Sequence, residues 1–279
     1  MDVKKIKYIL RKLMEKKGNP RFLLSKFACW ANITLPFKIR IDNIVFKHYP
    51  TSIASGLWLK DYSIDSDLFV IKNYIEENFI CFDVGANIGH LTALMAEKAS
   101  KGIVFAFEPA RKIFPYLLET INLNGLKNVI PFNIAISDSN GFFEFHEFLK
   151  ADDQSSLVSG NKSIDWEKIT INIPTMRLDT FCEIFNIRDI NFLKIDVEGA
   201  EFLVLQSSGK MSSNVDIIWF EYIEENYLNF GYEGKKVIDF LKTNNFEIKG
   251  LFNGNLIEIS KIDLKNWKGN LLALKKQNA

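Results

Sequence analysis

The segment from Phe79 to Gly89 constrains the fold more than any other part of this 279-residue chain. An apolar run ends at Asp83, a loop with glycines at positions 85 and 89 follows, and a helix-forming stretch begins at His90. Strand, glycine loop and helix in this order are typical of the first unit of nucleotide-binding α/β folds. Gly85 allows the backbone to turn and approach a ligand, and Gly89 allows the helix to start close to the strand.

The position of the acid in this loop favours one class of nucleotide ligand. The loop reads D-x-G-x-N-x-G, so an acid stands where dinucleotide-binding folds place their first glycine. A carboxylate there would repel a pyrophosphate, but it suits a ligand that carries an amine and a sulfonium. The loop therefore favours S-adenosyl-L-methionine over NAD, and the residues expected to bind it are Asp83, Gly85, Ala86, Asn87 and Gly89.

Two further predicted strands end in acids. Glu108 closes the apolar run 103–107 and precedes Pro109. An acid about 20 residues beyond a glycine loop can accept both ribose hydroxyls, and capping the next helix is the alternative role of Glu108. Asp196 closes a third apolar run, 192–195. Because ligands bind at the carboxyl ends of parallel strands, Asp83, Glu108 and Asp196 are expected to line one crevice.

Two further motifs follow the glycine loop and Glu108 along the chain. They are Arg177-Leu178-Asp179 and the run from Lys194 to Glu201. Across about residues 65 to 250 the chain resembles the FkbM-type S-adenosylmethionine-dependent methyltransferases. The resemblance implies a Rossmann-like class I α/β fold, with a mostly parallel seven-stranded sheet, an antiparallel final strand and helices on both faces. It also implies O-methylation of a hydroxyl on a sugar, glycan or secondary metabolite. An NAD-dependent oxidoreductase and a non-catalytic partner-binding protein with the same fold are the alternatives.

Methyl transfer from a sulfonium is an in-line displacement, so the protein has to position the acceptor and remove a hydroxyl proton. Asp196 is the first candidate for that proton acceptor, and holding the amine of the cofactor is its alternative role. Glu221, at the end of the following strand, is the second candidate. His90 is the third, because histidine suits proton transfer near neutral pH. Asp138 follows the third strand and is expected either near the adenine or in a turn.

No metal site is expected from the sequence. The three cysteines, at positions 29, 81 and 182, lie far apart, show no metal-ligand spacing and are expected to be reduced. Asp196 and Glu198 leave a metal-dependent mechanism open, but no third ligand can be identified. Asp179 is expected to serve as the N-cap of its helix.

Alternating patterns predict the remaining elements. Strands are expected at 79–84, 102–108, 128–135, 190–196 and 215–221, with helices between them and two last strands near 246–252 and 269–275. An inserted hairpin is expected from 141–148 and 168–175, on either side of a polar loop at 150–165.

Residues 1–64 are expected to form an N-terminal extension to a methyltransferase domain at 65–279. The extension includes a short β element at 35–49 and a basic helix at 1–17, whose apolar stripe consists of Ile6, Ile9, Leu10, Leu13 and Met14. Such a helix can dock on the domain, which is the preferred interpretation, or contact an anionic membrane.

Net charge and hydropathy limit the partners and the location. The net charge of +1 argues against binding nucleic acid through its phosphates. No signal peptide is evident, and no apolar run approaches the roughly 18 residues that a membrane span needs. The sequence predicts a cytoplasmic protein with a small-molecule or glycan acceptor, for which residues 1–17 offer a route to the inner membrane surface.

Overall fold

The structure, a computed structural model, describes residues 20–59, 66–148, 168–252 and 254–276. The chain divides into two compact units, Met1–Tyr62 and Ser63–Ala279. These are called the N-terminal unit and the larger unit below.

The described part of the N-terminal unit consists of α2 (Pro20–Ala31), the strands β1 (Leu35–Ile41) and β2 (Ile44–His48), and α3 (Ser52–Leu59). The two strands pair antiparallel, which confirms the β element expected at 35–49. Pro20 is the first residue of α2. Proline suits this position because the first helical N–H has no partner within the helix. The helix expected at 1–17 lies outside the described residues.

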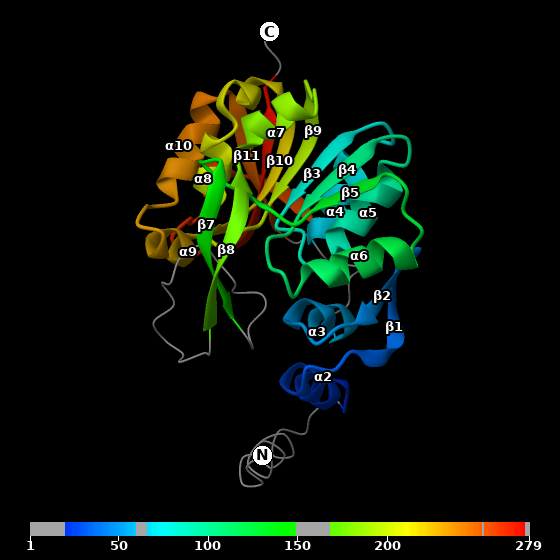
Figure 1. Ribbon diagram of the computed structural model, residues 1–279. Coiled ribbons are helices and arrows are strands. Elements are labelled where there is room, and N and C mark those ends of the chain that lie inside the picture. Colours follow the sequence, from blue (N-terminus) through cyan, green and yellow to red (C-terminus); the bar gives the residue numbers. More distant parts are fainter. Residues whose placement is uncertain (1–19, 60–65, 149–167, 253, 277–279) are drawn as a thin grey trace. The chain divides into compact units, whose positions relative to one another are not determined.

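A large sheet forms the centre of the larger unit (Figure 1). Within the described residues its strand order is β12-β11-β13-β10-β9-β3-β4-β5. The strands are β3 (Ile80–Val84), β4 (Ile103–Phe107), β5 (Val129–Phe132), β9 (Ile190–Ile195), β10 (Val215–Ile223), β11 (Phe246–Phe252), β12 (Asn255–Glu258) and β13 (Lys268–Lys275). The last strand, β13, is antiparallel to both of its neighbours, β10 and β11, as expected. The expected seven strands were one too few, because β12 pairs with β11 at the edge.

Helices cover both faces of this sheet (Figure 1). One group comprises α4 (Ser66–Tyr74), α5 (His90–Lys98) and α6 (Phe114–Leu123), and the other comprises α7 (Leu178–Ile184), α8 (Glu201–Gln206) and α10 (Lys235–Thr243). Strands covered on both faces read as continuous apolar runs, which is why their patterns were readily predicted. Phe181 of α7 packs edge-to-face on Phe107 of β4, with 4.8 Å between ring centroids. Short elements not predicted from the sequence are α9 (Glu224–Asn229), η3 (Gly209–Asn214) and η4 (Ile259–Lys261).

A smaller sheet has the order β6-β8-β7, with β6 (Ala135–Ile136), β7 (Gly141–Phe148) and β8 (Lys168–Met176). It confirms the expected strands of the inserted hairpin, whereas the polar loop at 150–165 lies outside the described residues. The single strand expected at 128–135 is divided between the two sheets. Asn133 lies at the division, where its side-chain amide donates to the backbone oxygens of Glu108 (2.7 Å) and Pro109 (3.1 Å). These bonds hold the chain at the end of β4 before it leaves the large sheet.

None of the helices in the described ranges combines the length and the apolar character needed to cross a membrane.

Candidate functional site

The three acids that were predicted to share a crevice lie at adjoining strand ends. β3 is paired on one side with β4 and on the other with β9, so that Val84 is in register with Phe107 and Ile195. Glu108 and Asp196 directly follow those two residues, and Asp83 precedes Val84. The carboxyl ends of parallel strands therefore bring these acids to the same edge of the sheet, where open α/β folds bind their ligands.

The glycine loop is held tightly between these strand ends. The backbone N–H groups of Gly85 and Ala86 both donate to the Phe107 oxygen, at 3.0 and 2.9 Å. Gly85 has φ +81°, and a Cβ atom added there would lie 1.8 Å from the backbone oxygen of Asp196. Only glycine fits this position, because a side chain would clash with backbone that cannot move aside easily.

Gly89 serves a different packing contact from the one expected. It also has φ +81°, but an added Cβ atom would meet Leu117 Cδ1 of α6 at 2.6 Å. The Cβ position at Gly89 therefore faces α6, a neighbour that the sequence did not predict. The small residue is needed because α5 begins against α6.

Glu108 joins the glycine loop to the turn that follows β4. Its Oε2 accepts from the Asn87 N–H at 2.8 Å, and its Oε1 accepts from the Ala110 N–H at 2.7 Å. Burial raises the pKa of Glu108 to about 7, although the two backbone bonds act in the opposite direction. Because a carboxylate has about four acceptor positions, this side chain retains capacity for the hydroxyls of a ligand.

Lys194 organises the strand ends, and sequence reasoning did not identify it as a site residue. Its side chain is buried, and its Nζ donates to the Gly85 oxygen at 2.7 Å. The same nitrogen lies 3.1 Å from Asp83 Oδ1 and 3.5 Å from Asp196 Oδ2. Burial lowers the pKa of Lys194, but Asp83 and Asp196 outweigh burial and raise this pKa above its usual value. A lysine inside the apolar run 192–195 was the sequence signal for this role.

The carboxyl group of Asp83 is turned into the protein. It is fully buried, and its Oδ2 accepts from the Thr92 hydroxyl at 2.6 Å while Oδ1 faces Lys194. Both oxygens are thus engaged by protein groups. In this arrangement neither oxygen of Asp83 is directed at the space beyond the strand ends.

Asp196, Glu198 and Glu221 form a carboxylate group beside the glycine loop. One oxygen from each lies within 4.8 Å of the others. The Asn226 amide donates to Glu198 Oε2 at 3.2 Å and to Glu221 Oε2 at 3.4 Å. Burial, followed by the charges of Asp196 and Glu198, raises the pKa of Glu221 to about 10. Glu221 stands where it could provide a third oxygen ligand for a divalent cation, which the sequence alone did not identify.

The turn after Asp196 adopts an unusual backbone conformation. Glu198 has φ +55° and Gly199 has φ +105°. A Cβ atom on Gly199 would lie 2.7 Å from the backbone oxygen of Asn226, so α9 packs directly on this turn. Glu201 is buried beneath it and accepts from the N–H groups of Val197 (3.0 Å) and Gly199 (3.4 Å). Burial raises the pKa of Glu201 to about 7.

His90 begins α5 and lies within the field of the same charges. It is 9% exposed, and its Nδ1 has no hydrogen-bond partner among the described residues. Burial, and then the charge of Lys194, lowers the pKa of His90 to about 3. An imidazole with this pKa is neutral at pH 7 and is a weak proton acceptor, which argues against the role in proton transfer considered for it.

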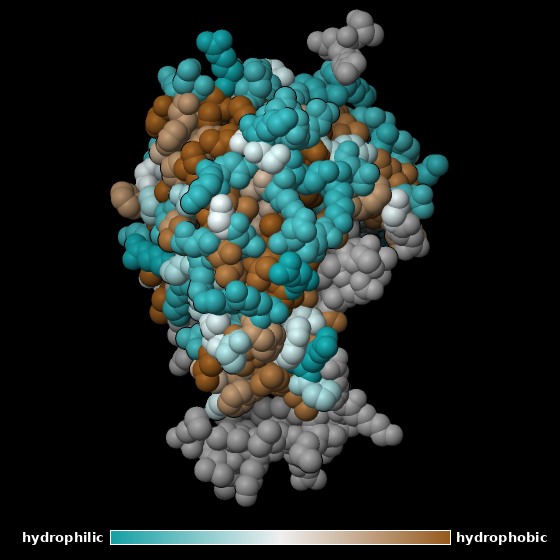
Figure 2. All heavy atoms as spheres, turned by 90° about the vertical axis from the view of Figure 1, so that its right-hand side faces the viewer, coloured by the Kyte–Doolittle hydropathy of each residue, from teal (hydrophilic) through white to brown (hydrophobic). Residues whose placement is uncertain are grey.

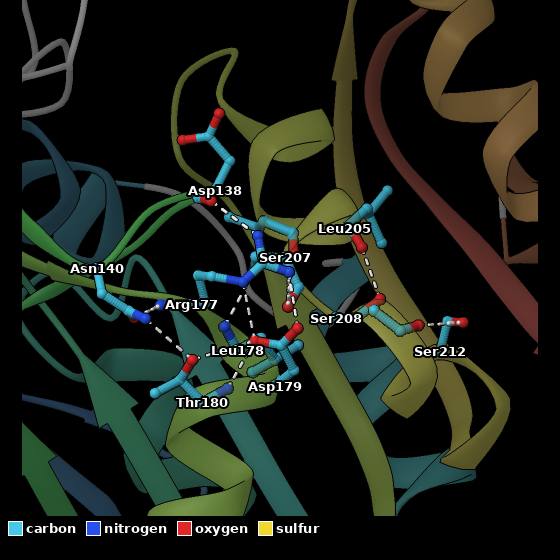
Figure 3. Close-up of polar contacts among 12 residues, drawn as sticks. Asp138, Asn140, Arg177, Leu178, Asp179, Thr180, Leu205, Ser207, Ser208 and Ser212 are labelled. Atoms are coloured by element: carbon cyan, nitrogen blue, oxygen red, sulfur yellow. Dashed lines mark hydrogen bonds and ion pairs between the residues drawn. The ribbon is translucent and has the colours of Figure 1, made fainter.

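Asp138 lies in a separate polar cluster centred on Arg177 (Figure 3). Its side chain is exposed, while its backbone oxygen accepts from Arg177 Nη1 at 2.8 Å. The guanidinium also makes two bonds to Asp179, at 3.0 and 2.7 Å, and one to the backbone oxygen of Ser207 at 3.3 Å. Asn140 accepts from the Arg177 N–H at 2.8 Å. The cluster ties the β6–β7 turn to the start of α7 and the end of α8.

The expectation that Asp179 is the N-cap of its helix was wrong. α7 begins at Leu178 and its N-cap is Arg177, so Asp179 lies within the first helical turn. Its Oδ1 accepts from the Thr180 N–H at 2.7 Å. The hydrogen bonds from Arg177 lower the pKa of Asp179. The acid therefore holds Arg177 in place, and it also complements the helix dipole.

Comparison with known proteins assigns this fold to a family. Residues 83–248 match the model of the methyltransferase FkbM domain. The chain belongs to this family. Membership makes the protein a methyltransferase with a class I fold, as the sequence motifs indicated, and does not support the oxidoreductase alternative.

Individual FkbM-domain relatives are distant. The 2-O-methyltransferase NoeI of Sinorhizobium fredii is 27% identical over 62% of this chain and 74% of its own length. The hexuronic acid methyltransferase AglP of Haloferax volcanii is 31% identical over 59% of this chain and 65% of its own length. A solved FkbM methyltransferase of Methylobacillus flagellatus is 12% identical, with a TM-score of 0.47, over 91% of this chain and 58% of that one. The chain spans about two thirds of the length of the curated relatives.

Proposed function

We propose that this FkbM-family protein transfers a methyl group from S-adenosyl-L-methionine to a hydroxyl of a sugar, glycan or related metabolite. The observation that carries the proposal is the position of Glu108 and Asp196 on the two sides of the glycine loop, at the ends of the strands that flank β3. The carboxylate that would bind the ribose hydroxyls and the carboxylate that would receive the proton are thereby both fixed by strands of the same sheet.

The residues around the loop fit the parts of this cofactor. The remaining acceptor positions of Glu108 suit the two ribose hydroxyls. The loop from Gly85 to Gly89 offers a close backbone approach, and the excess of carboxylates over Lys194 suits a ligand with two positive groups. Asp83 contributes to this field from its buried position. Asp138 remains a candidate for the adenine end, through its exposed side chain.

S-adenosylmethionine, when bound, supplies an activated methyl group. The acceptor oxygen would take the methyl group, S-adenosylhomocysteine would leave, and Asp196 would receive the hydroxyl proton. Asp196 suits this role because its side chain is 32% exposed and Lys194 balances its negative charge. Burial and the charges of Asp196 and Glu198 raise the pKa of Glu221, which makes its carboxyl group the less suitable candidate for receiving the proton.

The relatives and the charge of the larger unit both support a sugar-like acceptor. NoeI is named as a 2-O-methyltransferase and AglP as a hexuronic acid methyltransferase, which favours a hydroxyl on a carbohydrate. The larger unit has 22 Lys and Arg against 30 Asp and Glu, a net charge of −8. This negative balance disfavours a nucleic-acid acceptor, since phosphates would be repelled.

Two measurements test the proposal in sequence. Titration calorimetry should show S-adenosylhomocysteine binding near the micromolar range, about −8 kcal/mol, and no comparable binding of NAD. Transfer of a tritiated methyl group into sugar and glycan fractions of cell extracts should then yield a product whose label resists hydrolysis as an ether does. Binding of NAD alone would overturn the cofactor, and label on nitrogen or carbon would overturn the hydroxyl acceptor.

A further inference from the structure

The helix α2 has an inverted burial pattern. Its fully buried residues are small, namely Ser25 and Ala28, whereas its large apolar residues are exposed. The exposed fractions are 39% for Phe22, 51% for Phe27 and 40% for Trp30. Soluble proteins normally bury aromatic side chains of this size, so an exposed group of them marks a contact surface.

The three aromatic residues lie on one side of the helix. At 3.6 residues per turn, Phe22, Trp30 and Phe27 fall within an arc of about 140°, and Ser25 and Ala28 lie on the opposite side. We call these three residues the α2 aromatic face. Two more exposed apolar side chains adjoin it, Leu24 (42%) and Ile33 (48%).

Polar contacts on the side of α2 that carries Ser25 and Ala28 fix the orientation of the helix about its own axis. Ser25 Oγ lies 2.8 Å from His48 Nε2, and both side chains are buried. Cys29 Sγ lies 3.5 Å from the Thr51 oxygen and 3.5 Å from Ser55 Oγ. Turning the aromatic face inward would break these contacts, so its exposure is a built feature of the unit. In Figure 2 the described side chains at the height of α2 and α3 are mostly brown and tan.

Charge identifies the partner that suits this face. The N-terminal unit has 13 Lys and Arg against 4 Asp and Glu, a net charge of +9. One of these cations stands at the face itself, because Lys26 lies 5.7 Å from the ring centre of Phe22. A second copy of the chain would bring two units of +9 together, which disfavours a dimer through this face.

We propose that the α2 aromatic face docks on an anionic lipid surface. Tryptophan and phenylalanine favour the boundary between headgroups and acyl chains, and neighbouring lysine and arginine side chains favour anionic headgroups. The basic residues at 1–17 add to the same attraction. The contact would hold a methyltransferase against a bilayer without a membrane-spanning helix.

Co-sedimentation of the full-length protein with vesicles tests the proposal. The protein should pellet with phosphatidylcholine vesicles that contain about 30% phosphatidylglycerol and stay in solution with pure phosphatidylcholine. Raising the NaCl from about 50 mM to about 500 mM should release it, because salt screens the headgroup charge. Equal binding to both vesicle types, or to neither, would overturn the proposal.

Matched variants locate the contact. The double variant Phe27→Ser/Trp30→Ser should lower partitioning at least about tenfold, because the aromatic anchors are lost. Phe252→Ser, an equally exposed phenylalanine of the larger unit (59%), should bind vesicles like the wild type. Circular dichroism verifies that each variant is folded. Retention of full binding by the double variant, with loss on deletion of residues 1–17, would assign the contact to that segment and overturn the proposal. The proposal would also be overturned if the wild type were a dimer that does not bind vesicles and the double variant were a monomer. The face would then be a dimer interface.

Discussion

The larger unit contains two polar clusters that balance charge in opposite ways. In the Arg177 cluster, one guanidinium meets one carboxylate, and the other partners are backbone or amide oxygens (Figure 3). At the strand ends, the buried ammonium of Lys194 faces both Asp83 and Asp196, with Glu108 and Glu221 also within its field. A balanced cluster holds segments together, whereas an excess of one charge with raised pKa values is typical of sites that await a ligand. Variants in each cluster test this distinction.

The largest effect is expected at Asp196. Asp196→Asn should lower turnover by roughly 10²–10⁴-fold, because the amide cannot accept the hydroxyl proton. The affinity for S-adenosylhomocysteine, measured by calorimetry, should stay near that of the wild type. A parallel collapse of affinity and turnover would instead make Asp196 a cofactor ligand, and another group would have to take the proton.

The next largest effect is expected for Lys194→Met, which should lower the stability of the folded protein. It leaves Asp83 buried without its cation, and breaking one partner of a buried pair costs about 3–5 kcal/mol of unfolding free energy. Urea denaturation measures this loss. The double variant Lys194→Met/Asp83→Asn should recover part of it, since the uncompensated charge is removed. Equal stabilities of the single and double variants would show that Asp83 and Lys194 are not coupled.

The Arg177 cluster should show the reverse profile. Arg177→Ala should lower the free energy of unfolding by about 1–3 kcal/mol, the range for charge-assisted hydrogen bonds, and leave turnover within about twofold. Because the pKa of Asp179 is lowered in the folded state, its stabilisation is complete above the unfolded pKa of about 4 and is lost as pH falls through the lowered value. The difference between wild type and variant should therefore shrink in acid. A large loss of turnover at full stability would place this cluster in the functional site.

Glu108 should control cofactor affinity. Glu108→Gln should weaken the binding of S-adenosylhomocysteine by about 1–3 kcal/mol, since the amide presents fewer acceptors to the ribose. Because the pKa of Glu108 is raised to about 7, its carboxylate is lost as pH falls through 7, and the affinity of the wild type should fall with it. Calorimetry between about pH 6 and pH 8 measures this slope, which should be absent in Glu108→Gln. Glu201→Gln is the matched control, because the pKa of Glu201 is also raised to about 7. An unchanged affinity in Glu108→Gln would show that Glu108 does not bind the cofactor and only accepts the hydrogen bonds from Asn87 and Ala110.

The sequence predicted the elements whose patterns are local. Continuous apolar runs located β3, β4 and β9, and the acid at each strand end followed from the direction of parallel strands. It could not show that Asp83 turns inward, because that depends on Lys194, 111 positions along the chain. The contact between Gly89 and Leu117 likewise depends on how two helices pack. The sequence also did not predict α2, whose large apolar residues face outward. The raised pKa of Glu221 likewise depends on burial and on the charges of Asp196 and Glu198, which lie in another segment of the chain.

The smallest effect is expected from metal removal. Asp196, Glu198 and Glu221 could ligate a divalent cation, but Lys194 already faces Asp196, and the Asn226 amide already donates to the other two. Because the pKa of Glu221 is raised, a cation would have to compete with a proton at this carboxyl group before all three oxygens could bind. Turnover should therefore be unchanged after dialysis against EDTA. A loss that Mg²⁺ restores in the wild type but not in Glu221→Gln would show that the carboxylates form a metal centre. The excess charge at the strand ends would then be balanced by an ion, and Asp196 would be a metal ligand that positions the acceptor.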